Sequence, residues 1–328
     1  MTTPIHRRDA LAAAAGMVLS PLAVPALAAA PSARRSAAAA TPLTQDPAKP
    51  FRLIHMTDIH VQPERQAERG AAQAWVRAQE LKPDLVITGG DTVMDVFDAK
   101  RDRAKVMRGC YERMMKDVSV PVLHTTGNHD ILGWNRSRTD VPLDAADWGK
   151  KWACETFAQP RNYLSSDRGG WRFILLDSVQ PDGNGYKGFL DPEQRAWFEA
   201  ELAATPAGTP ICVVSHIPII AVTTITYGKP PARGSDTILS GGEMHTDCAE
   251  LHELMRASGK VRLCLSGHIH LRDRCETDGI TYINDGAVSG SWWKGPLEGV
   301  PEGFGVLDLR PDGTFDHRYE TYGWTAQD

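Results

Sequence analysis

The sequence lacks several features that mark particular classes of protein. It has six cysteines but no Cys-x-x-Cys pair, so a thiolate zinc site is not expected. It has no run of five or six like charges and a formal net charge of −5, which disfavours a surface built to coat nucleic acid. No serine lies in a nucleophile-elbow pattern. What remains is the composition of an ordinary soluble enzyme, with 42% hydrophobic and 23% charged residues among 328.

The N-terminal 50 residues have the pattern of a targeting segment followed by a linker. Arg7 and Arg8 precede an apolar, alanine-rich run over residues 10–30, with small residues suited to cleavage at its end. The arginine pair resembles a twin-arginine export signal; an ordinary secretory signal and an uncleaved anchor are the alternatives. Pro21 and Pro25 interrupt the apolar run, so the mature form is expected to have no membrane-spanning helix. We therefore expect an exported protein, periplasmic or extracellular, with a signal peptide over 1–30, a disordered linker over 31–50 and a single domain over 51–328.

Beyond residue 50, short apolar runs alternate with amphipathic stretches. This alternation predicts an α/β fold, in which a sheet with parallel strands carries helices on its faces. The apolar runs around Cys212 and Cys264 place both cysteines in the core as free thiols. Strands are predicted at 51–56, 84–88, 120–125, 171–177, 211–215, 261–266, 279–284, 303–309 and 314–322, and helices at 66–81, 99–117, 192–204 and 247–258.

Three connections are unusually long and rich in Gly, Pro or Trp. They cover residues 131–147, 178–191 and 217–246. Long connections in compact domains are commonly lids or specificity elements, and floppy loops are the alternative.

Five short polar clusters each follow directly on an apolar strand. Because the carboxyl ends of parallel strands meet at one edge of an open sheet, these clusters are expected to converge in one crevice. In the two His-containing pairs with one residue between them, alternate positions of extended backbone would point to the same side. The clusters are Asp58-Ile59-His60, Gly89-Gly90-Asp91, Gly127-Asn128-His129-Asp130, Ser215-His216 and Gly267-His268-Ile269-His270.

The chemistry of these clusters is that of a metal site. Taken singly, each is compatible with a turn, a buried histidine or a surface residue, and only their conjunction indicates metal ligands. Oxygen and imidazole ligands without thiolate suit Mn, Fe, Zn, Ni or Mg. Glycines beside the ligands permit sharp turns and close backbone approach.

The order of the five clusters resembles the calcineurin-like metallophosphoesterase family, and within it the class III branch of cyclic-nucleotide phosphodiesterases. The resemblance implies a four-layer α-β-β-α sandwich of two mixed sheets, with two divalent or mixed-valence metal ions at the strand carboxyl ends. It assigns one metal to Asp58, His60 and His270. It assigns the other to Asn128, His216 and His268, with Asp91 bridging the two. His129 would bind no metal and would lie near the leaving-group oxygen.

Three neighbouring positions qualify the resemblance. Purple acid phosphatases have a tyrosine that binds ferric iron where this chain has Met94, which disfavours that subfamily. Many relatives have a second histidine where this chain has Ser215, a change with no predicted consequence. Asp130 is expected to orient a histidine or to cap the following turn.

The predicted function is hydrolysis of a phosphodiester by a hydroxide that the metal pair activates. The substrate is expected to be a small molecule: a cyclic nucleotide, a nucleotide-like ester or a glycerophospho ester. A phosphomonoesterase or nucleotidase on the same centre is the alternative, and a catalytically silent metal-binding protein is the third hypothesis. The metals are left open among Mn, Fe, Zn and Ni, and no nucleic-acid polymer is expected as a partner.

Aromatic and histidine residues of the loops are the candidates for substrate contact. Trp292 and Trp293 can stack a base or hold an apolar group, unless both pack beneath the terminal strands. His245 can reach the substrate from the longest loop, unless it is a surface histidine. Tyr163 and Trp134 are weaker candidates of the same kind.

Overall fold

The computed structural model describes residues 49–327. The predicted signal peptide and nearly all of the predicted linker therefore lie outside the described residues. Within the described range, no helix is both long and apolar enough to cross a membrane.

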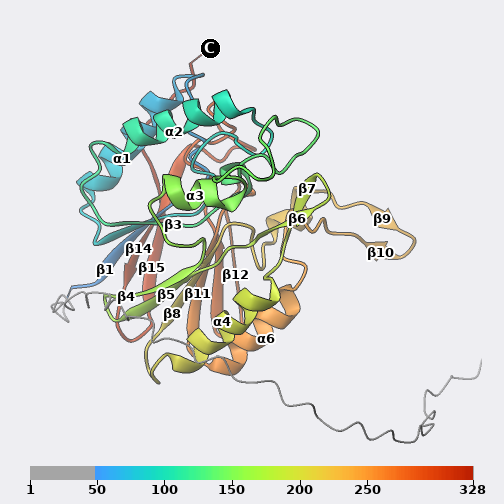
Figure 1. The fold of residues 1–328 in the computed structure, drawn as a ribbon. Helices are drawn as coiled ribbons and strands as arrows, with labels where there is room; N and C mark the ends of the chain where they lie inside the picture. Colours follow the sequence, from blue (N-terminus) through green and yellow to red (C-terminus); the bar gives the residue numbers. More distant parts are fainter. Residues whose placement is uncertain (1–48, 328) are drawn as a thin grey trace, which may run out of the picture. The chain divides into compact units, whose positions relative to one another are not determined.

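Two mixed sheets lie at the centre of the fold (Figure 1). In the first, β1, β2 and β3 are parallel, while β14 and β15 extend the sheet antiparallel at the β1 edge. Its order is β15-β14-β1-β2-β3, with β1 at Phe51–Met56, β2 at Leu85–Thr88, β3 at Val122–His124, β14 at Gly303–Leu309 and β15 at Phe315–Thr321.

The second sheet has a parallel centre and two antiparallel edges. Strands β13, β11, β8 and β5 are parallel, and β12 and β4 pair antiparallel at the two ends. Its order is β12-β13-β11-β8-β5-β4, with β4 at Leu164–Arg168, β5 at Trp171–Leu175, β8 at Ile211–Ser215, β11 at Val261–Ser266, β12 at Asp273–Thr277 and β13 at Ile280–Asn284.

Helices cover the outer face of each sheet (Figure 1). The first sheet is covered by α1 (Ala67–Glu80), α2 (Arg101–Met115) and α3 (Lys150–Thr156), and the second by α4 (Pro192–Ala204) and α6 (Cys248–Ser258). Helix α4 begins where Asp191 accepts a hydrogen bond from the Gln194 N–H and Pro192 opens the first turn. Helix α6 ends at Gly259, whose φ of 64° suits glycine. The predicted four-layer sandwich is confirmed.

Alternation along the central strands separates the core into layers. In β1, Leu53 packs between the two sheets whereas Ile54 packs against the helices; in β5, Phe173 and Ile174 divide in the same way. Both faces of these strands are therefore buried, which is why their sequences are almost continuously apolar. Cys212 and Cys264 are buried and free, as predicted.

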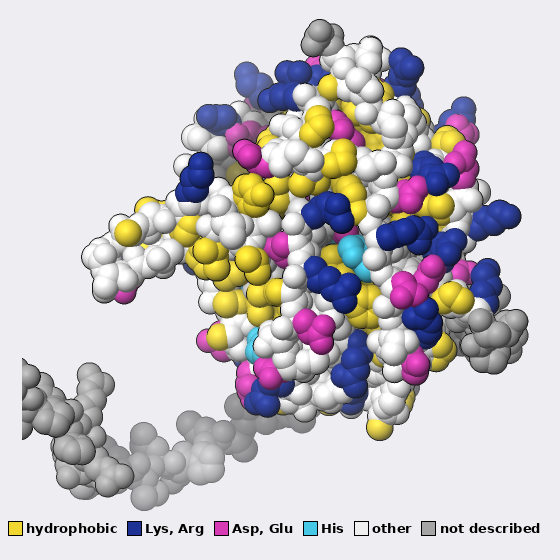
Figure 2. Space-filling view, turned by 180° about the vertical axis from the view of Figure 1, so that it is seen from behind, with side chains coloured by type: hydrophobic (Ala, Val, Ile, Leu, Met, Phe, Trp, Pro, Cys, Tyr) yellow, Lys and Arg dark blue, Asp and Glu magenta, His cyan; other side chains and the backbone are white. Residues whose placement is uncertain are grey.

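The structure contains several short helices and strands that the sequence did not predict. Helix α3 and strands β4 and β12 were not predicted. The connection over 178–191 contains a hairpin of β6 (Val179–Asp182) and β7 (Gly185–Gly188). The connection over 217–246 contains α5 (Thr223–Thr226) and a projecting hairpin of β9 (Ala232–Arg233) and β10 (Asp236–Thr237) (Figure 1). Seen from behind, apolar side chains gather where this hairpin joins the rest of the fold, and elsewhere Lys and Arg are interspersed with Asp and Glu (Figure 2).

Helix α1 approaches the loop after β13 through a glycine. A Cβ at Gly70 would meet the ring carbons of Trp293, a side chain with no exposed surface. The rigid indole is also held by a hydrogen bond from its Nε1 to the His60 carbonyl, at 3.0 Å. The glycine therefore sets how closely α1 packs against this loop.

We expect Gly70→Ala to destabilise the protein although alanine is the better helix former. The helix would gain about 1 kcal/mol, but overpacking against a ring that cannot move costs about 1–3 kcal/mol. Gly109→Ala in α2 is the control, because its Cβ would meet only the flexible end of Arg113. Urea midpoints should fall for the first variant and hold or rise for the second. A Gly70→Ala midpoint equal to that of the wild type would show that Trp293 moves to make room for the added methyl group.

A buried carboxylate links the two sheets. Asp285, which follows β13, lies 2.8 Å from His55 Nδ1 on β1 and 2.9 Å from His317 Nε2 on β15. Burial would raise the pKa of Asp285, but its hydrogen bonds with His317 and His55 hold the pKa below its ordinary value of 3.8. The carboxylate therefore contributes stability while it is ionised, and this contribution is lost as the pH falls through its folded-state pKa.

Asp285→Asn should lower the free energy of unfolding by about 1–3 kcal/mol at pH 7, because a buried charged acceptor is lost. Since the folded-state pKa is below 3.8, the difference from wild type should be constant at higher pH and shrink below about pH 4. Denaturant unfolding at pH 7, 5 and 3 measures this difference in the free energy of unfolding. Asp316→Asn, which changes an exposed carboxylate, is the control. A gap of equal size at pH 7 and pH 3 would contradict the ionised link.

Candidate metal centre

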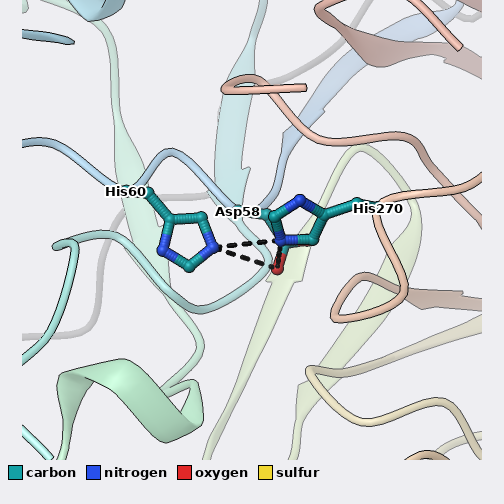
Figure 3. A group of neighbouring side chains, drawn as sticks. All are labelled: Asp58, His60 and His270. Carbon is teal, nitrogen blue, oxygen red and sulfur yellow. Dashed lines mark hydrogen bonds and ion pairs between the residues drawn. The ribbon is translucent and has the colours of Figure 1, made fainter. Parts of the chain in front are cut away.

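The first predicted ligand group assembles from two different sheets. Asp58 and His60 follow β1, and His270 follows β11. The Nε2 atoms of His60 and His270 are 3.0 Å apart, and His270 Nε2 is 3.4 Å from Asp58 Oδ1 (Figure 3). All three side chains are buried and point toward one common position.

The second predicted group forms beside the first. His216 Nε2 lies 3.3 Å from Asp91 Oδ2 and 3.1 Å from Asn128 Oδ1. The His268 ring centroid is 5.0 Å from that of His216, and Asp91, His216 and His268 can offer atoms to one ion. Asp91 is also 3.8 Å from His60 Nε2, so its carboxylate stands between the two groups.

His129 stands at the exposed edge of this centre. Its side chain is 24% exposed, whereas the side chains of His60 and His216 have no exposed surface. Its Nε2 is 3.8 Å from Asp91 Oδ2, and its Nδ1 is 3.5 Å from Asp95 Oδ1. The ring meets that of His60 edge-on at 4.9 Å, and the two histidines with Asp91 form a third group able to approach an ion.

The backbone of the ligand loops differs from the prediction. Asp58, His60, His268 and His270 have φ values of 54°, 48°, 72° and 58°, so these residues are left-handed rather than extended. Asp91 shares this conformation, with φ 51°. Side chains still converge in pairs, but they do so through tight turns after the strands. Left-handed backbone is costly for residues with a Cβ and clusters at functional sites.

Backbone amides join one ligand loop to the next. The His268 N–H donates to Asp58 Oδ2 at 2.9 Å, and the His129 N–H donates to Asp91 Oδ1 at 2.8 Å. Such close approach requires glycine at two positions, since a Cβ at Gly127 would collide with Asp91 and one at Gly267 with Asp58. The carboxylates therefore fix the positions of the neighbouring ligands as well as their own.

Carbonyl groups orient two of the histidines. His216 Nδ1 lies 2.8 Å from the Gly89 carbonyl, and His270 Nδ1 lies 2.7 Å from the Gly290 carbonyl. Since a carbonyl only accepts, Nδ1 donates a hydrogen in both rings, and Nε2 is the nitrogen that faces the centre and would bind a metal ion through its lone pair.

Asp130 braces two ligand loops. It accepts hydrogen bonds from the N–H groups of Gly127 at 2.9 Å, Thr92 at 3.0 Å and Val93 at 3.2 Å. It thus caps its own turn rather than the following one and ties that turn to the loop bearing Asp91, and none of these hydrogen bonds goes to a histidine. Burial and the Asp91 charge raise the pKa of Asp130 to about 7.

The electrostatics of the centre favour added positive charge. Burial lowers the pKa of His268 to about 4 and holds that of His60 well below its usual range. For His216 and His129, burial lowers the pKa, but the surrounding carboxylates, Asp91 foremost, together outweigh burial and raise the pKa to about 9 in each ring. Among the described residues, no Lys or Arg forms an ion pair with Asp58 or Asp91. Two buried carboxylates without such a partner, facing imidazole nitrogens, fit a cation site.

Among the residues predicted to contact the substrate, Trp292 lies beside the metal centre. Trp292 is half-buried, and its ring is 4.5 Å from that of His270 and 6.1 Å from that of His60. Trp293 does not face a substrate: it has no exposed surface and packs on Gly70 and Trp324. Adjacent aromatic residues of one turn thus have separate roles.

His245 is also buried rather than free to meet a substrate. Its Nδ1 is 2.9 Å from Asp247 Oδ1, and its Nε2 is 3.1 Å from Ser215 Oγ, which donates to the Ile217 carbonyl. Ser215, where many relatives have a histidine, therefore links His245 to the end of β8 that carries His216. Tyr163 lies in a separate cluster with Arg161 and Trp197.

Sequence reasoning missed two residues near the ligands. Tyr186, on β7, meets His268 edge-on at 5.9 Å, and Asp95 approaches His129. The available signals were weak: a Gly-Tyr-Lys-Gly run in a long connection and an acid four residues after Asp91. Met94, at the position of the iron-binding tyrosine, packs at the edge of the helix-side core.

The sequence matches the family model for calcineurin-like phosphoesterases over residues 51–272. The chain belongs to the calcineurin-like phosphoesterase family. No protein with curated annotation matches this family member in a sequence comparison. Membership in this family agrees with the resemblance predicted from the sequence. Members of the family use a binuclear metal centre, and the two ligand groups of this chain fit such a centre.

Three solved structures have a fold similar to that of this chain. A dimetal phosphatase from Danio rerio has a TM-score of 0.55 and 15% identity, covering 80% of this chain and 93% of its own. Purple acid phosphatase PPD1 from yellow lupin (Lupinus luteus) seeds has a TM-score of 0.51 and 16% identity, covering 84% and 52%. GAP50, the anchor in the inner membrane complex of Plasmodium, has a TM-score of 0.51 and 16% identity, covering 84% and 85%. At these identities the likeness concerns the fold alone.

Loading with Mn²⁺ should raise the melting temperature of the chelator-stripped protein. At 100 times the dissociation constant, a ligand that binds only the folded state adds about 2.7 kcal/mol. Asp91→Asn should weaken Mn²⁺ binding by more than about 100-fold, because it changes the shared ligand rather than an outer-shell partner. Asp316→Asn, an exposed carboxylate on β15, is the control. Calorimetric titration would contradict the site if both variants bound Mn²⁺ as the wild type does.

Proposed function

We propose that this chain hydrolyses a phosphodiester of a small molecule. The observation that carries the proposal is the pair of ligand groups that meet at the Asp91 carboxylate, 3.8 Å from His60 on one side and 3.3 Å from His216 on the other. Asp58, His60 and His270 would hold one metal. Asn128, His216 and His268 would hold the other.

The side chains divide the work as follows. When bound, the metals supply an activated nucleophile and offset charge on the phosphoryl oxygens. Asp91 and the buried ligands would hold the ions, and the carbonyls of Gly89 and Gly290 accept hydrogen bonds that favour the tautomer two imidazoles need to bind them. His129, at the exposed edge, would donate a proton to the departing alcohol, and Asp95 lies 3.5 Å from its Nδ1.

The positions of the nearby arginines favour a diester over a monoester. A phosphate monoester carries a second negative charge, which additional cations beside the metals would stabilise. Arg136 donates to the carbonyls of Gly133 and Val141, and Arg138 lies 3.2 Å from Asp98. Arg136 is thus engaged within the 131–147 connection, and Arg138 is paired with a carboxylate outside it. A phosphomonoesterase is the second candidate, in keeping with the fold shared with a dimetal phosphatase.

Turnover of two chromogenic esters tests the proposal. Mn²⁺-loaded protein should hydrolyse bis-p-nitrophenyl phosphate with a higher kcat/KM than p-nitrophenyl phosphate, and chelator should abolish both activities. His129→Ala should lower kcat on the diester by about 10²–10⁴-fold, the usual worth of a general acid, with bound metal unchanged. His252→Ala, a histidine paired with Tyr282 and Asp278 away from the centre, is the control.

Each outcome has a distinct reading. A preference for the monoester would replace the proposal with the phosphatase alternative. Absence of turnover with both esters, in protein shown to contain metal, would favour a binding role; GAP50, described as an anchor, shares the fold.

A further inference from the structure

A cavity of about 570 Å³ opens beside the connections over 131–147 and 178–191. Its apolar lining includes Trp134, Trp148, Pro181 and Leu143, whose side chain is 63% exposed although it is a large hydrophobic residue. Its volume lies within the range of about 300–1,000 Å³ that is usual for small-molecule sites. None of the predicted metal ligands lines the cavity, so it is a separate site.

A row of aromatic rings joins this cavity to the metal centre. Tyr186 lies 5.9 Å from the metal-ligand candidate His268, and Phe97 lies 5.7 Å from Tyr186. Trp134 follows at 6.3 Å from Phe97, and Trp148 at 6.5 Å from Trp134. Trp134 and Trp148, which line the cavity, are therefore the last two rings of a row that begins beside His268.

The cavity also connects to the side of the centre where the leaving group would depart. His129 Nδ1 approaches Asp95, and Asp95 Oδ1 accepts the Phe97 N–H at 2.7 Å. The carbonyl of Val96 accepts the N–H of Gly133, the residue before Trp134. The short segment 95–97 thus couples the proposed proton donor to the cavity wall.

The lining of the cavity carries two cations, Arg136 and Lys150, and two carboxylates, Asp177 and Asp191, so its formal charge is zero. Lys150 Nζ lies 2.6 Å from Asp177 Oδ2 and 5.3 Å from the centre of the Trp134 ring. Arg136 donates to two backbone carbonyls, as described above. A second phosphate would therefore meet a lining with no net positive charge, whereas a neutral flat ring would find two indoles to stack on. The indole N–H groups of Trp134 and Trp148 have no acceptor within the described chain.

We propose that this cavity, the Trp134 pocket, binds the aromatic or nucleoside part of the alcohol that the phosphoester releases. The inference rests on the proposed phosphodiesterase function and narrows it. Esters with an aryl or nucleoside alcohol would be substrates, and those with a small polar alcohol such as glycerol would gain nothing from the pocket.

Adenosine binding tests the pocket without any turnover. The chelator-stripped full chain is titrated with adenosine, and binding is measured by ligand-observed NMR. Wild type should bind adenosine saturably and glycerol not at all. Trp134→Ala should weaken adenosine binding by about 10-fold, within the range measured when an aromatic base platform is removed. Leu143→Asp, at a position that is 63% exposed, should also weaken adenosine binding. Trp197→Ala, in the separate cluster with Tyr163 and Arg161, should leave it unchanged.

Turnover by the Mn²⁺-loaded chain supplies the second arm. Trp134→Ala should lower kcat/KM for bis-p-nitrophenyl phosphate by about 10-fold, by analogy with base stacking, and leave that for glycerophosphoethanolamine unchanged. Adenosine binding that depends on Trp134 in a chain that hydrolyses neither ester would uphold the pocket and reject the phosphodiesterase function. Hydrolysis of both esters, with adenosine unbound and neither rate altered by Trp134→Ala, would overturn the pocket while the function stands.

Discussion

The Asp91 carboxylate is the interaction on which the site depends. It is 2% exposed, yet three histidine rings and one backbone N–H from other loops approach its oxygens. A carboxylate buried so deeply would be costly if it stood alone. Its burial is tolerable because positive charge gathers around it, from imidazole in the absence of metal and from cations when they bind. The strand ends of both sheets must therefore meet at one place, and the antiparallel additions at the sheet edges leave that place free.

Backbone conformation is part of the same constraint. Five ligand candidates adopt left-handed φ, a choice that local preferences oppose. Two things hold them there: amide donors that bond to the carboxylates, and glycines that let one loop contact the next. The Asp285 link between β1, β15 and the end of β13 serves a related purpose, since it fixes one sheet against the other just below the loops. The accuracy of the site is thus a property of both sheets together.

Much of this arrangement could be predicted from the sequence, and the reasons are physical. Central strands such as β1 and β11 are buried on both faces, so their apolar runs are unmistakable, and the polar clusters that follow them mark the sheet edge. Strand β4, at a sheet edge, and the short hairpin of β6 and β7 carry polar and glycine residues, so no apolar run identifies them. The left-handed turns were equally hidden, because Asp and His, although enriched at positive φ, adopt negative φ far more often, so residue type alone does not identify such a turn. Trp292 and Trp293 show the same limit: adjacent and identical in type, they are separated only by a turn that places one at the centre and the other in the core.

The ligand set determines the chemistry of the site, whereas the loops determine which substrate it accepts. Asp, Asn and His at five strand ends suffice to hold two metals, and this arrangement is compatible with hydrolysis of many esters. Discrimination among esters must come from groups that contact the rest of the substrate, and those groups lie on connections whose conformation depends on tertiary packing. Here the 131–147 and 178–191 connections contribute Trp134 and Tyr186, and Trp148 follows directly after the first of them; the row of rings begins at His268 and ends in the cavity. A chain that kept its ligands but exchanged these two connections would be expected to keep the chemistry and change the substrate.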